Sequence, residues 1–258
     1  MKETKAIEVI PAAARARGLA LVAVAVAIYV VLRLLGFHKL FAEDADGVNV
    51  LLQIIGTLYS VVYAFATFVI WGQFAAVENE ILEEAGALKD LVLFSRGVRE
   101  AMRDPMVRSV RSYARGVIES EWGTLSRGER TEQTDRLFSA IITSLTDTKP
   151  EGEGERSIYE RLLEIANRAS AHREERLAIS AKRMPRTLFL FVTVTAIAIL
   201  FLLLFYPFHN LAFGIVAIAL ATMLLFFAHF VLADLDNPFE GTWNVSSQPF
   251  HDLISKCH

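Results

Sequence analysis

Four long apolar stretches dominate the pattern of hydrophobic and polar positions along the chain. They cover residues 18–37, 48–74, 187–206 and 211–233. Each comes close to the length of about 20 residues that a helix needs to cross the hydrocarbon core of a bilayer. Because a chain of 258 residues cannot bury four such helices on all sides, the pattern predicts an integral membrane protein with four transmembrane helices.

The second apolar stretch does not stop at the expected membrane boundary. Apolar residues continue at helical spacing through residue 98, with no strand-like alternation. This predicts one long helix that leaves the bilayer. We expect it to end at Asp104-Pro105, because the residue before a proline disfavours the helical conformation.

The region between the two pairs of spans is polar and has helical periodicity throughout. Charged neighbours within it, at 83–84 and 173–175, are expected on solvated helix faces. The predicted fold class is therefore all-α, with four transmembrane helices and a helical cytoplasmic domain over 75–186. After the long helix we expect three further helices in this domain, at 106–125, 131–145 and 156–184.

Basic residues near the ends of the spans indicate the orientation in the membrane. Lysines and arginines precede the first span and crowd the entry to the third, whereas the turn at 207–210 has none. The N-terminal segment 1–17, the domain 75–186 and the C-terminal tail 234–258 are therefore expected in the cytoplasm. One alternative stays open, in which residues 1–42 are a cleaved signal peptide and three spans remain.

Composition narrows the classes of function. The chain is 53% hydrophobic and 21% charged, with a mean hydropathy of +0.39, which suits a protein divided between lipid and water. A net charge of −3 and the lack of a long basic run argue against nucleic acid as a partner. The single cysteine, Cys257, excludes an intramolecular disulfide and a CxxC metal site. No common catalytic motif occurs, so we expect no enzyme.

The second span carries the best candidate site. Small and polar side chains on one face of a transmembrane helix have two interpretations: packing against another helix, or the wall of a water-filled pore. An acidic residue at the cytoplasmic end would concentrate cations. The candidate pore-lining residues lie alternately four and three positions apart, on one stripe of a helix: Gln53, Thr57, Ser60, Ala64, Thr67, Trp71, Phe74 and Glu78.

Two further features concern ionisable and aromatic residues near the fourth span. His229 lies inside this span, where an ionisable side chain is a functional candidate by default. It is either a neutral, hydrogen-bonded packing residue or a proton sensor. In the tail, the large apolar side chains of Phe239, Trp243 and Phe250 are expected to dock on the cytoplasmic helices.

Three groups of motifs stand out along the chain. They are GTLYSVVYAFATFVIW followed by AVENEILEEAGALKDL, Tyr113-x-x-x-Val117 with Glu121-Trp122, and Asp236-Asn237-Pro238-Phe239-Glu240-Gly241 followed by Gln248-Pro249-Phe250. These motifs resemble the bestrophin family, and most closely its bacterial bestrophin-like members, over about residues 47–250. The resemblance implies a homo-oligomeric, pentameric channel for small ions in the bacterial inner membrane, with the second helices around a central pore.

The chain departs from the family pattern after the fourth span. In bestrophins, an Asn-Pro-Phe-Gly stretch there leads into an acidic cluster that binds calcium in some members. Here only Glu240 follows the motif, while Asp234 and Asp236 precede it. The resemblance allows a calcium site built from these three carboxylates, although calcium needs six to eight oxygen ligands. Alternatively, Asp236 caps a turn or pairs with an arginine.

The aromatic constriction of the bestrophin pore has no clear counterpart on the polar stripe. Tyr59 and Tyr63, or Phe65 and Val69, have the four-residue spacing of that constriction but lie off the stripe. Which face of the second transmembrane helix is directed toward the pore therefore stays open. The predicted function is an ion channel with a central pore. The alternative is a non-conducting membrane scaffold or sensor whose cytoplasmic helices bind a partner.

Overall fold

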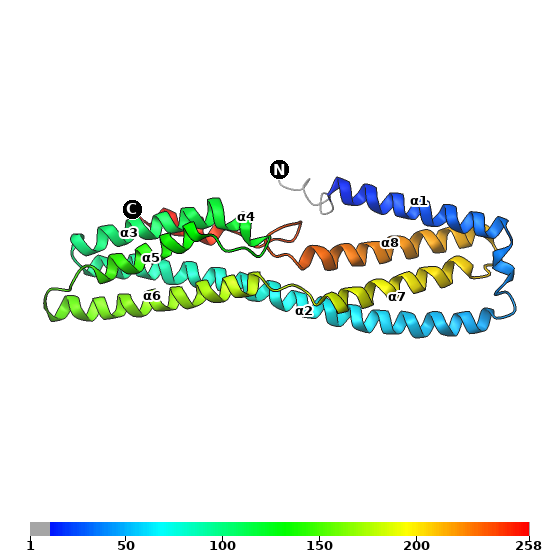
Figure 1. Ribbon diagram of the computed structural model, residues 1–258, viewed down its shortest axis with the longest axis horizontal. Helices are drawn as coiled ribbons and strands as arrows, with labels where there is room; N and C mark the ends of the chain where they lie inside the picture. Colours follow the sequence, from blue (N-terminus) through cyan, green and yellow to red (C-terminus); the bar gives the residue numbers. More distant parts are fainter. Residues whose placement is uncertain (1–10, 258) are drawn as a thin grey trace, which may run out of the picture. The chain divides into compact units, whose positions relative to one another are not determined.

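The computed structural model describes residues 11–257, and all regular secondary structure in that range is helical (Figure 1). The predicted all-α fold class is confirmed. Of the N-terminal segment predicted over 1–17, residues 1–10 lie outside the described residues. The elements are α1 (Ala12–Leu34), η1 (Phe37–Lys39), α2 (Ala45–Phe94), η2 (Ser95–Gly97), α3 (Glu100–Gly116), η3 (Val117–Glu121), α4 (Trp122–Leu125), α5 (Glu132–Thr146), α6 (Gly152–Ser180), α7 (Arg186–Phe205), α8 (Leu211–Leu235) and α9 (Gln248–Lys256).

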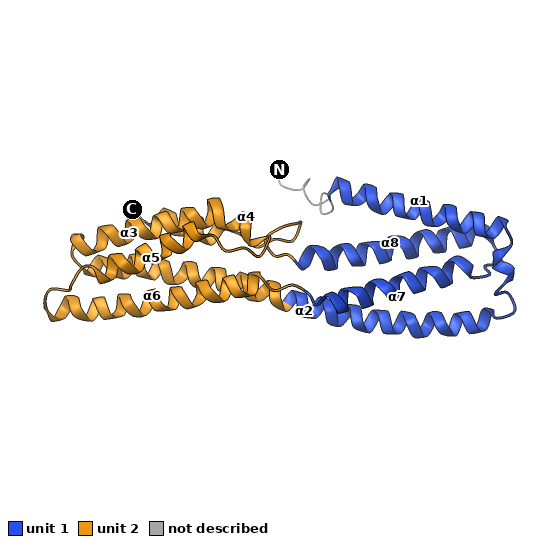
Figure 2. Ribbon diagram, viewed as in Figure 1, with its two compact units in different colours: residues 1–71, 184–236 blue, residues 72–183, 237–258 orange. Residues whose placement is uncertain are grey.

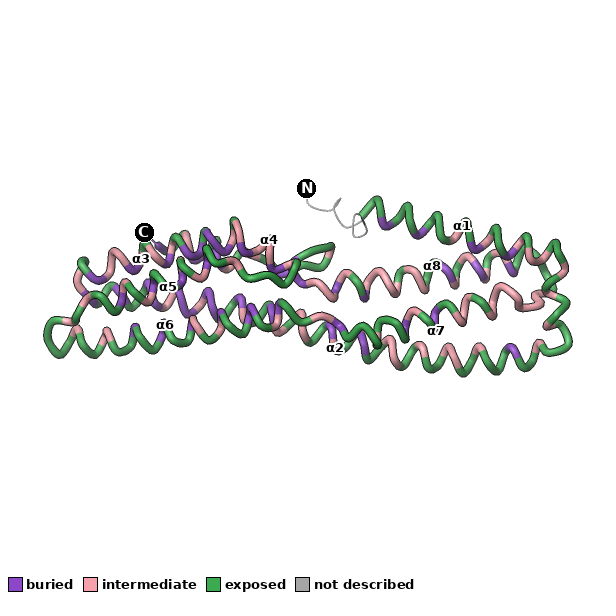
Figure 3. The backbone as a smooth tube through the Cα atoms, in the orientation of Figure 1, coloured by how far each residue is buried: buried purple, intermediate pink, exposed green. Residues whose placement is uncertain are grey.

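Four helices, α1, α2, α7 and α8, are long and apolar enough to cross a membrane. In the most apolar window of each helix, only 11% to 17% of the residues are buried by the folded chain itself. Figure 3 accordingly marks most positions along these windows as exposed or intermediate. Apolar surface of this extent must be covered by lipid or by other protein. The chain is therefore a membrane protein with four candidate spans.

The chain folds as two compact units, which Figure 2 colours separately. Unit 1 consists of residues 1–71 and 184–236, and unit 2 consists of residues 72–183 and 237–258. Unit 1 therefore contains α1, α7, α8 and the N-terminal part of α2. Unit 2 contains the rest of α2 together with α3, α4, α5, α6 and the tail with α9.

In unit 1, close packing depends on small residues, as is usual where the hydrophobic effect does not drive helices together. Helix α1 packs on α8, and Tyr29 of α1 is only 1% exposed. A Cβ atom on Gly214 of α8 would overlap the hydroxyl group of Tyr29, so only glycine allows this approach. A second cluster joins Ala66 and Ile70 of α2 to α7 and α8.

Unit 2 has a larger apolar core, to which α2, α3, α5, α6 and α9 contribute. The tail is part of it: Phe239 and Phe250 are 8% and 0% exposed. Their rings meet the edge of the Trp122 ring, with centroids 5.3 and 6.2 Å away. The predicted docking of the tail is confirmed for these two residues, whereas Trp243 remains 44% exposed.

The predicted end of the long helix at Asp104-Pro105 is wrong. Helix α2 ends at Phe94, and Pro105 lies inside α3. The break comes earlier because the backbone turns at η2 and becomes extended at Val98. At Gly97 this turn passes close to α6, where a Cβ atom would come within 2.7 Å of the end of the Ile158 side chain.

Candidate functional site

Within unit 1, α2 has a packed face, an exposed apolar face and an exposed polar stripe. The packed face contributes Ala66 and Ile70, which are 0% and 1% exposed, to the contact with α7 and α8. The helix therefore uses one side only for the fold of its own subunit. The exposed apolar face consists of Ile54, Leu58, Val61, Phe65 and Phe68, which are 45% to 76% exposed.

The polar stripe is the third face, and the fold of the subunit leaves it accessible. Along α2 in unit 1, five of its members are exposed and Thr67 is half-buried. On the part of α2 that belongs to unit 2, Phe74 is half-buried and Glu78 is exposed. Core packing therefore does not account for the small and polar residues at these positions. The five exposed members are Gln53, Thr57, Ser60, Ala64 and Trp71.

Two hydroxyl groups of the stripe are already bonded within the helix. Ser60 Oγ donates to the carbonyl oxygen of Gly56 at 2.8 Å, and Thr67 Oγ1 donates to that of Tyr63 at 2.9 Å. Such bonds to the preceding turn satisfy a hydroxyl proton inside a helix. The hydroxyl oxygens keep their lone pairs, so this face presents hydrogen-bond acceptors.

A second group of polar residues, missed by the sequence analysis, lies inside unit 2. Glu84 on α2, Tyr113 on α3, Glu121 at the end of η3, and Arg173 and Arg176 on α6 form what we call the buried ion cluster. Each of these residues is at most 4% exposed. Two positive and two negative charges are thus removed from water together, which is tolerable only if each is paired.

Hydrogen bonds connect every member of the cluster. Arg176 donates from Nε to Glu84 and from Nη2 to Glu121, both at 2.6 Å. The Tyr113 hydroxyl donates to Glu84 and accepts from Arg173 Nε at 3.1 Å and Arg176 Nη2 at 3.3 Å. At the edge of the cluster, Arg173 also binds the partly exposed carboxylate of Asp135 at 2.6 Å.

The charges of the cluster reinforce one another. Burial raises the pKa of Tyr113 well above its usual value, and Glu84 raises it further, so the hydroxyl stays protonated and acts as a donor. Burial lowers the pKa of Arg176, but the neighbouring Glu84, Tyr113 and Glu121 outweigh this effect and raise it. Arg176 is therefore charged, and the cluster fixes α2 to α3 and α6 within unit 2.

The expectation that 83–84 and 173–175 lie on solvated faces is wrong for Glu84 and Arg173. The sequence holds a signal that would have corrected it. On α6, Arg173 and Arg176 continue the helical spacing of the buried residues Leu162, Ile165, Ala166 and Ala169. On α2, Glu84 lies between Ile81 and Leu88 on the buried face.

Comparison with known proteins shows the family of this chain and the solved structures that it resembles. A family model described as the bestrophin-like domain matches residues 18–250. The chain belongs to the bestrophin-like family. Two mutants of a bacterial bestrophin homolog from Klebsiella pneumoniae have similar structures, with TM-scores of 0.71 and 0.70 at 11% and 10% sequence identity. The likeness covers 93% of this chain and 99% and 97% of those chains. No curated protein matches the sequence.

Residues of the bestrophin-like motif after the fourth span form hydrogen bonds with other parts of the chain. Within unit 1, Asp236 Oδ1 accepts a hydrogen bond of 2.6 Å from the backbone N–H of Met184, at the entry to α7. Within unit 2, the Asn237 side-chain amide donates to the carbonyl oxygen of Ser126 at 3.0 Å. It also donates to Glu240 at 3.3 Å.

These contacts bear on the candidate calcium ligands Asp234, Asp236 and Glu240. Among the residues that the structure describes, no group of three or more His, Cys, Asp or Glu side chains is placed to hold a metal ion. Asp236 and Glu240 each accept a hydrogen bond from protein instead. A calcium site at Asp234, Asp236 and Glu240 stays a prediction that the resemblance implies.

The aromatic pair of this bestrophin-like α2 belongs to its packed face. Tyr59 and Tyr63 stack with centroids 5.8 Å apart, and Tyr63 Oη donates to the carbonyl oxygen of Ala228 on α8 at 3.2 Å. Phe65 is 59% exposed on the apolar face. Tyr59 and Tyr63 are thus directed toward the neighbouring helices of their own subunit, away from the polar stripe.

His229 is packed and hydrogen-bonded. Its Nδ1 lies 2.9 Å from the carbonyl oxygen of Leu225, to which it donates in the neutral form. The ring stacks near Tyr59 and meets Phe189 edge-on, with centroids 6.5 and 6.2 Å away. These contacts are those of a side chain that packs between helices. A proton-sensing role stays a prediction.

Proposed function

We propose that this bestrophin-like protein is the subunit of a homo-oligomeric ion channel, with five copies whose α2 helices surround a central pore. One observation carries the proposal. The subunit buries Ala66 and Ile70 of α2 in its own core but leaves the polar stripe from Gln53 to Trp71 accessible. Polar residues facing lipid would be unfavourable, so a water-filled axis is the environment that suits them.

The chemistry of the stripe suits small ions. The hydroxyl groups of Ser60 and Thr67 donate hydrogen bonds to helix carbonyls. Their oxygen lone pairs stay available and replace part of the water around a cation. Glu78 adds a negative charge toward the cytoplasmic end of the stripe and raises the local concentration of cations. We therefore propose that the pore passes small ions and favours cations over anions.

The proposal includes the orientation of the subunit. Lysines and arginines before the first and third spans support an orientation with both termini and the domain 75–186 in the cytoplasm of a bacterial cell. The part of α2 in unit 2 then continues the pore beyond the membrane. The buried ion cluster supports this function by holding the extension in one position through Glu84.

Ion flux into liposomes tests the proposal. Purified protein is reconstituted, and flux of sodium and chloride is compared with that in empty vesicles. We expect flux above the empty vesicles that falls at least several-fold in Ser60→Phe, because the new ring narrows the proposed pore. The matched control is Val61→Phe, which places the same ring on the apolar face, where Val61 is 63% exposed.

Two outcomes contradict the proposal. One is an absence of flux from vesicles that contain intact oligomers, which would favour a non-conducting scaffold or sensor. The other is an equal loss of flux in Ser60→Phe and Val61→Phe, because the two faces would then not differ. Size-exclusion chromatography of both variants shows whether the oligomer has formed.

A further inference from the structure

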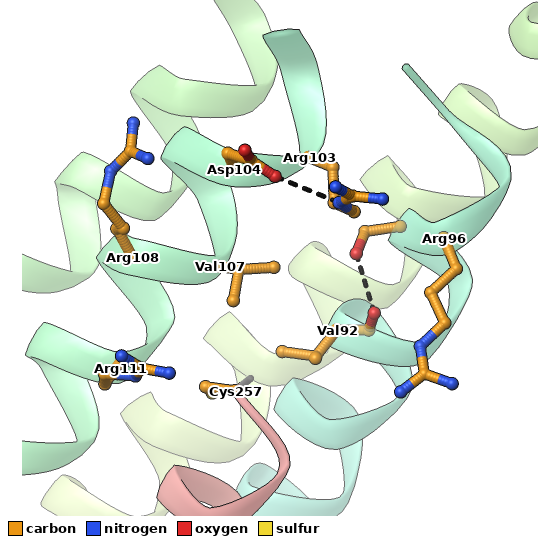
Figure 4. A pocket seen from close by; sticks show the side chains of 9 residues that line it. Val92, Arg96, Arg103, Asp104, Val107, Arg108, Arg111 and Cys257 are labelled. Carbon is orange, nitrogen blue, oxygen red and sulfur yellow. Dashed lines mark hydrogen bonds and ion pairs between the residues drawn. The ribbon is translucent and has the colours of Figure 1, made fainter. Parts of the chain in front are cut away.

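Unit 2 contains a basic cavity that has no part in the proposed pore. Its volume is about 530 Å³, and it lies where the end of α2, η2, α3 and the end of the tail meet. Figure 4 shows it with Arg96 and Arg108 on opposite sides and Arg111 directed toward Cys257. The lining residues are Val92, Ser95, Arg96, Arg103, Asp104, Val107, Arg108, Arg111 and Cys257.

The lining carries an excess of positive charge. It includes four arginines but a single acidic residue, Asp104. That carboxylate pairs with Arg103 at 3.0 Å, and Glu100 lies 3.3 Å from the same guanidinium group. Within residues 11–257, no acidic side chain lies within ion-pair distance of Arg96 or Arg108. Two guanidinium groups therefore remain to bind an anion from outside the chain.

The rest of the lining is apolar or neutral. Val92 and Val107 provide apolar contact between the arginines. Cys257 is buried, and its thiol donates to the carbonyl oxygen of Leu253 at 3.4 Å. Burial raises the pKa of this thiol, although Arg111 opposes the shift, so the thiol is neutral and supplies no counter-charge for the arginines.

We propose that this cavity binds a soluble organic phosphate. Guanidinium groups match phosphate oxygens with two parallel hydrogen bonds, which makes arginine the preferred residue for such anions. The volume lies within the range of about 300–1,000 Å³ that is usual for small-molecule sites. The valines suit the organic part of such a ligand. The inference does not depend on whether the protein conducts ions.

A binding measurement on the purified full-length protein tests the site. The protein in phosphatidylcholine nanodiscs is titrated with pyrophosphate and with AMP by calorimetry at constant ionic strength. Adenosine serves as the matched compound without phosphate. We expect both phosphates to bind, adenosine not to bind, and the affinity for both phosphates to fall at least ten-fold in Arg96→Gln/Arg108→Gln. Both side chains are exposed, so the variant should fold normally.

The control variant is Arg127→Gln/Arg136→Gln, which removes the same charge from arginines that lie outside this cavity and are 61% and 81% exposed. It should bind both phosphates like the wild type. The proposal is overturned if neither phosphate binds the wild type, or if both double variants lose affinity equally. It is also overturned if only soluble dihexanoyl-phosphatidylglycerol binds, since the site would then recognise a lipid headgroup.

Discussion

Arg176 is fully buried, and its contacts with Glu84 and Glu121 decide whether the charged interior of unit 2 is stable. A buried ion pair contributes little compared with a well-packed apolar core, but removing one partner leaves the other charge in a medium of low polarity. The consequence is an asymmetry. The cluster adds little to stability when complete and becomes strongly destabilising when a single member is lost.

Replacing this arginine tests the asymmetry. Arg176→Met keeps much of the volume and leaves Glu84 and Glu121 without their main partner. We expect the free energy of unfolding to fall by about 3–5 kcal/mol, measured by denaturant unfolding in detergent. Arg136→Met is the matched control, because Arg136 forms an exposed pair with Glu132 and should be nearly neutral. A loss in Arg176→Met no larger than in the control would contradict the account.

Between elements, the contact of α1 with α8 depends on Gly214, which leaves room for Tyr29. We expect Gly214→Ala to lower the free energy of unfolding by about 1–3 kcal/mol, because the added methyl group forces the Tyr29 ring to move. Gly72→Ala is the control, since a Cβ atom on Gly72 would meet nothing within 4 Å. Thermal unfolding in detergent measures both, and equal Tm values would contradict this role.

Local patterns in the sequence were sufficient to predict most elements. The four candidate spans follow from length and hydropathy alone, and Thr131 was correctly expected at the start of α5. The end of α2 could not be predicted in this way. The chain turns there at η2, where Gly97 lies close to Ile158, a residue far away in the sequence.

The candidate sites show the same limit. The polar stripe of α2 was visible because its members repeat along one helix. The buried ion cluster was not found, because charged residues are assigned to solvent unless a partner is known. The partners of Glu84 lie on other elements, at Tyr113 and Arg176. The basic cavity could not be predicted for the same reason, because Cys257 and Arg96 come together only in the folded unit.

For the whole molecule, we predict a closed ring of subunits. The exposed apolar face of α2 needs lipid or neighbouring subunits, and a cyclic arrangement covers such faces without leaving an open end. Projection images of purified particles should show five-fold symmetry about a stained, hydrated centre. Two-fold particles with no central channel would contradict the ring and would support a scaffold.

The most direct test of the central claim is whether water reaches the polar stripe of α2 in the assembled protein. Single cysteines are introduced in a Cys257→Ser background and labelled with a charged, membrane-impermeant thiol reagent. We expect labelling at Thr57, Ser60 and Ala64, with Phe65 and Ala66 protected by lipid and by the core. Uniform protection of all five positions, from both sides of an intact oligomer, would contradict the proposed pore.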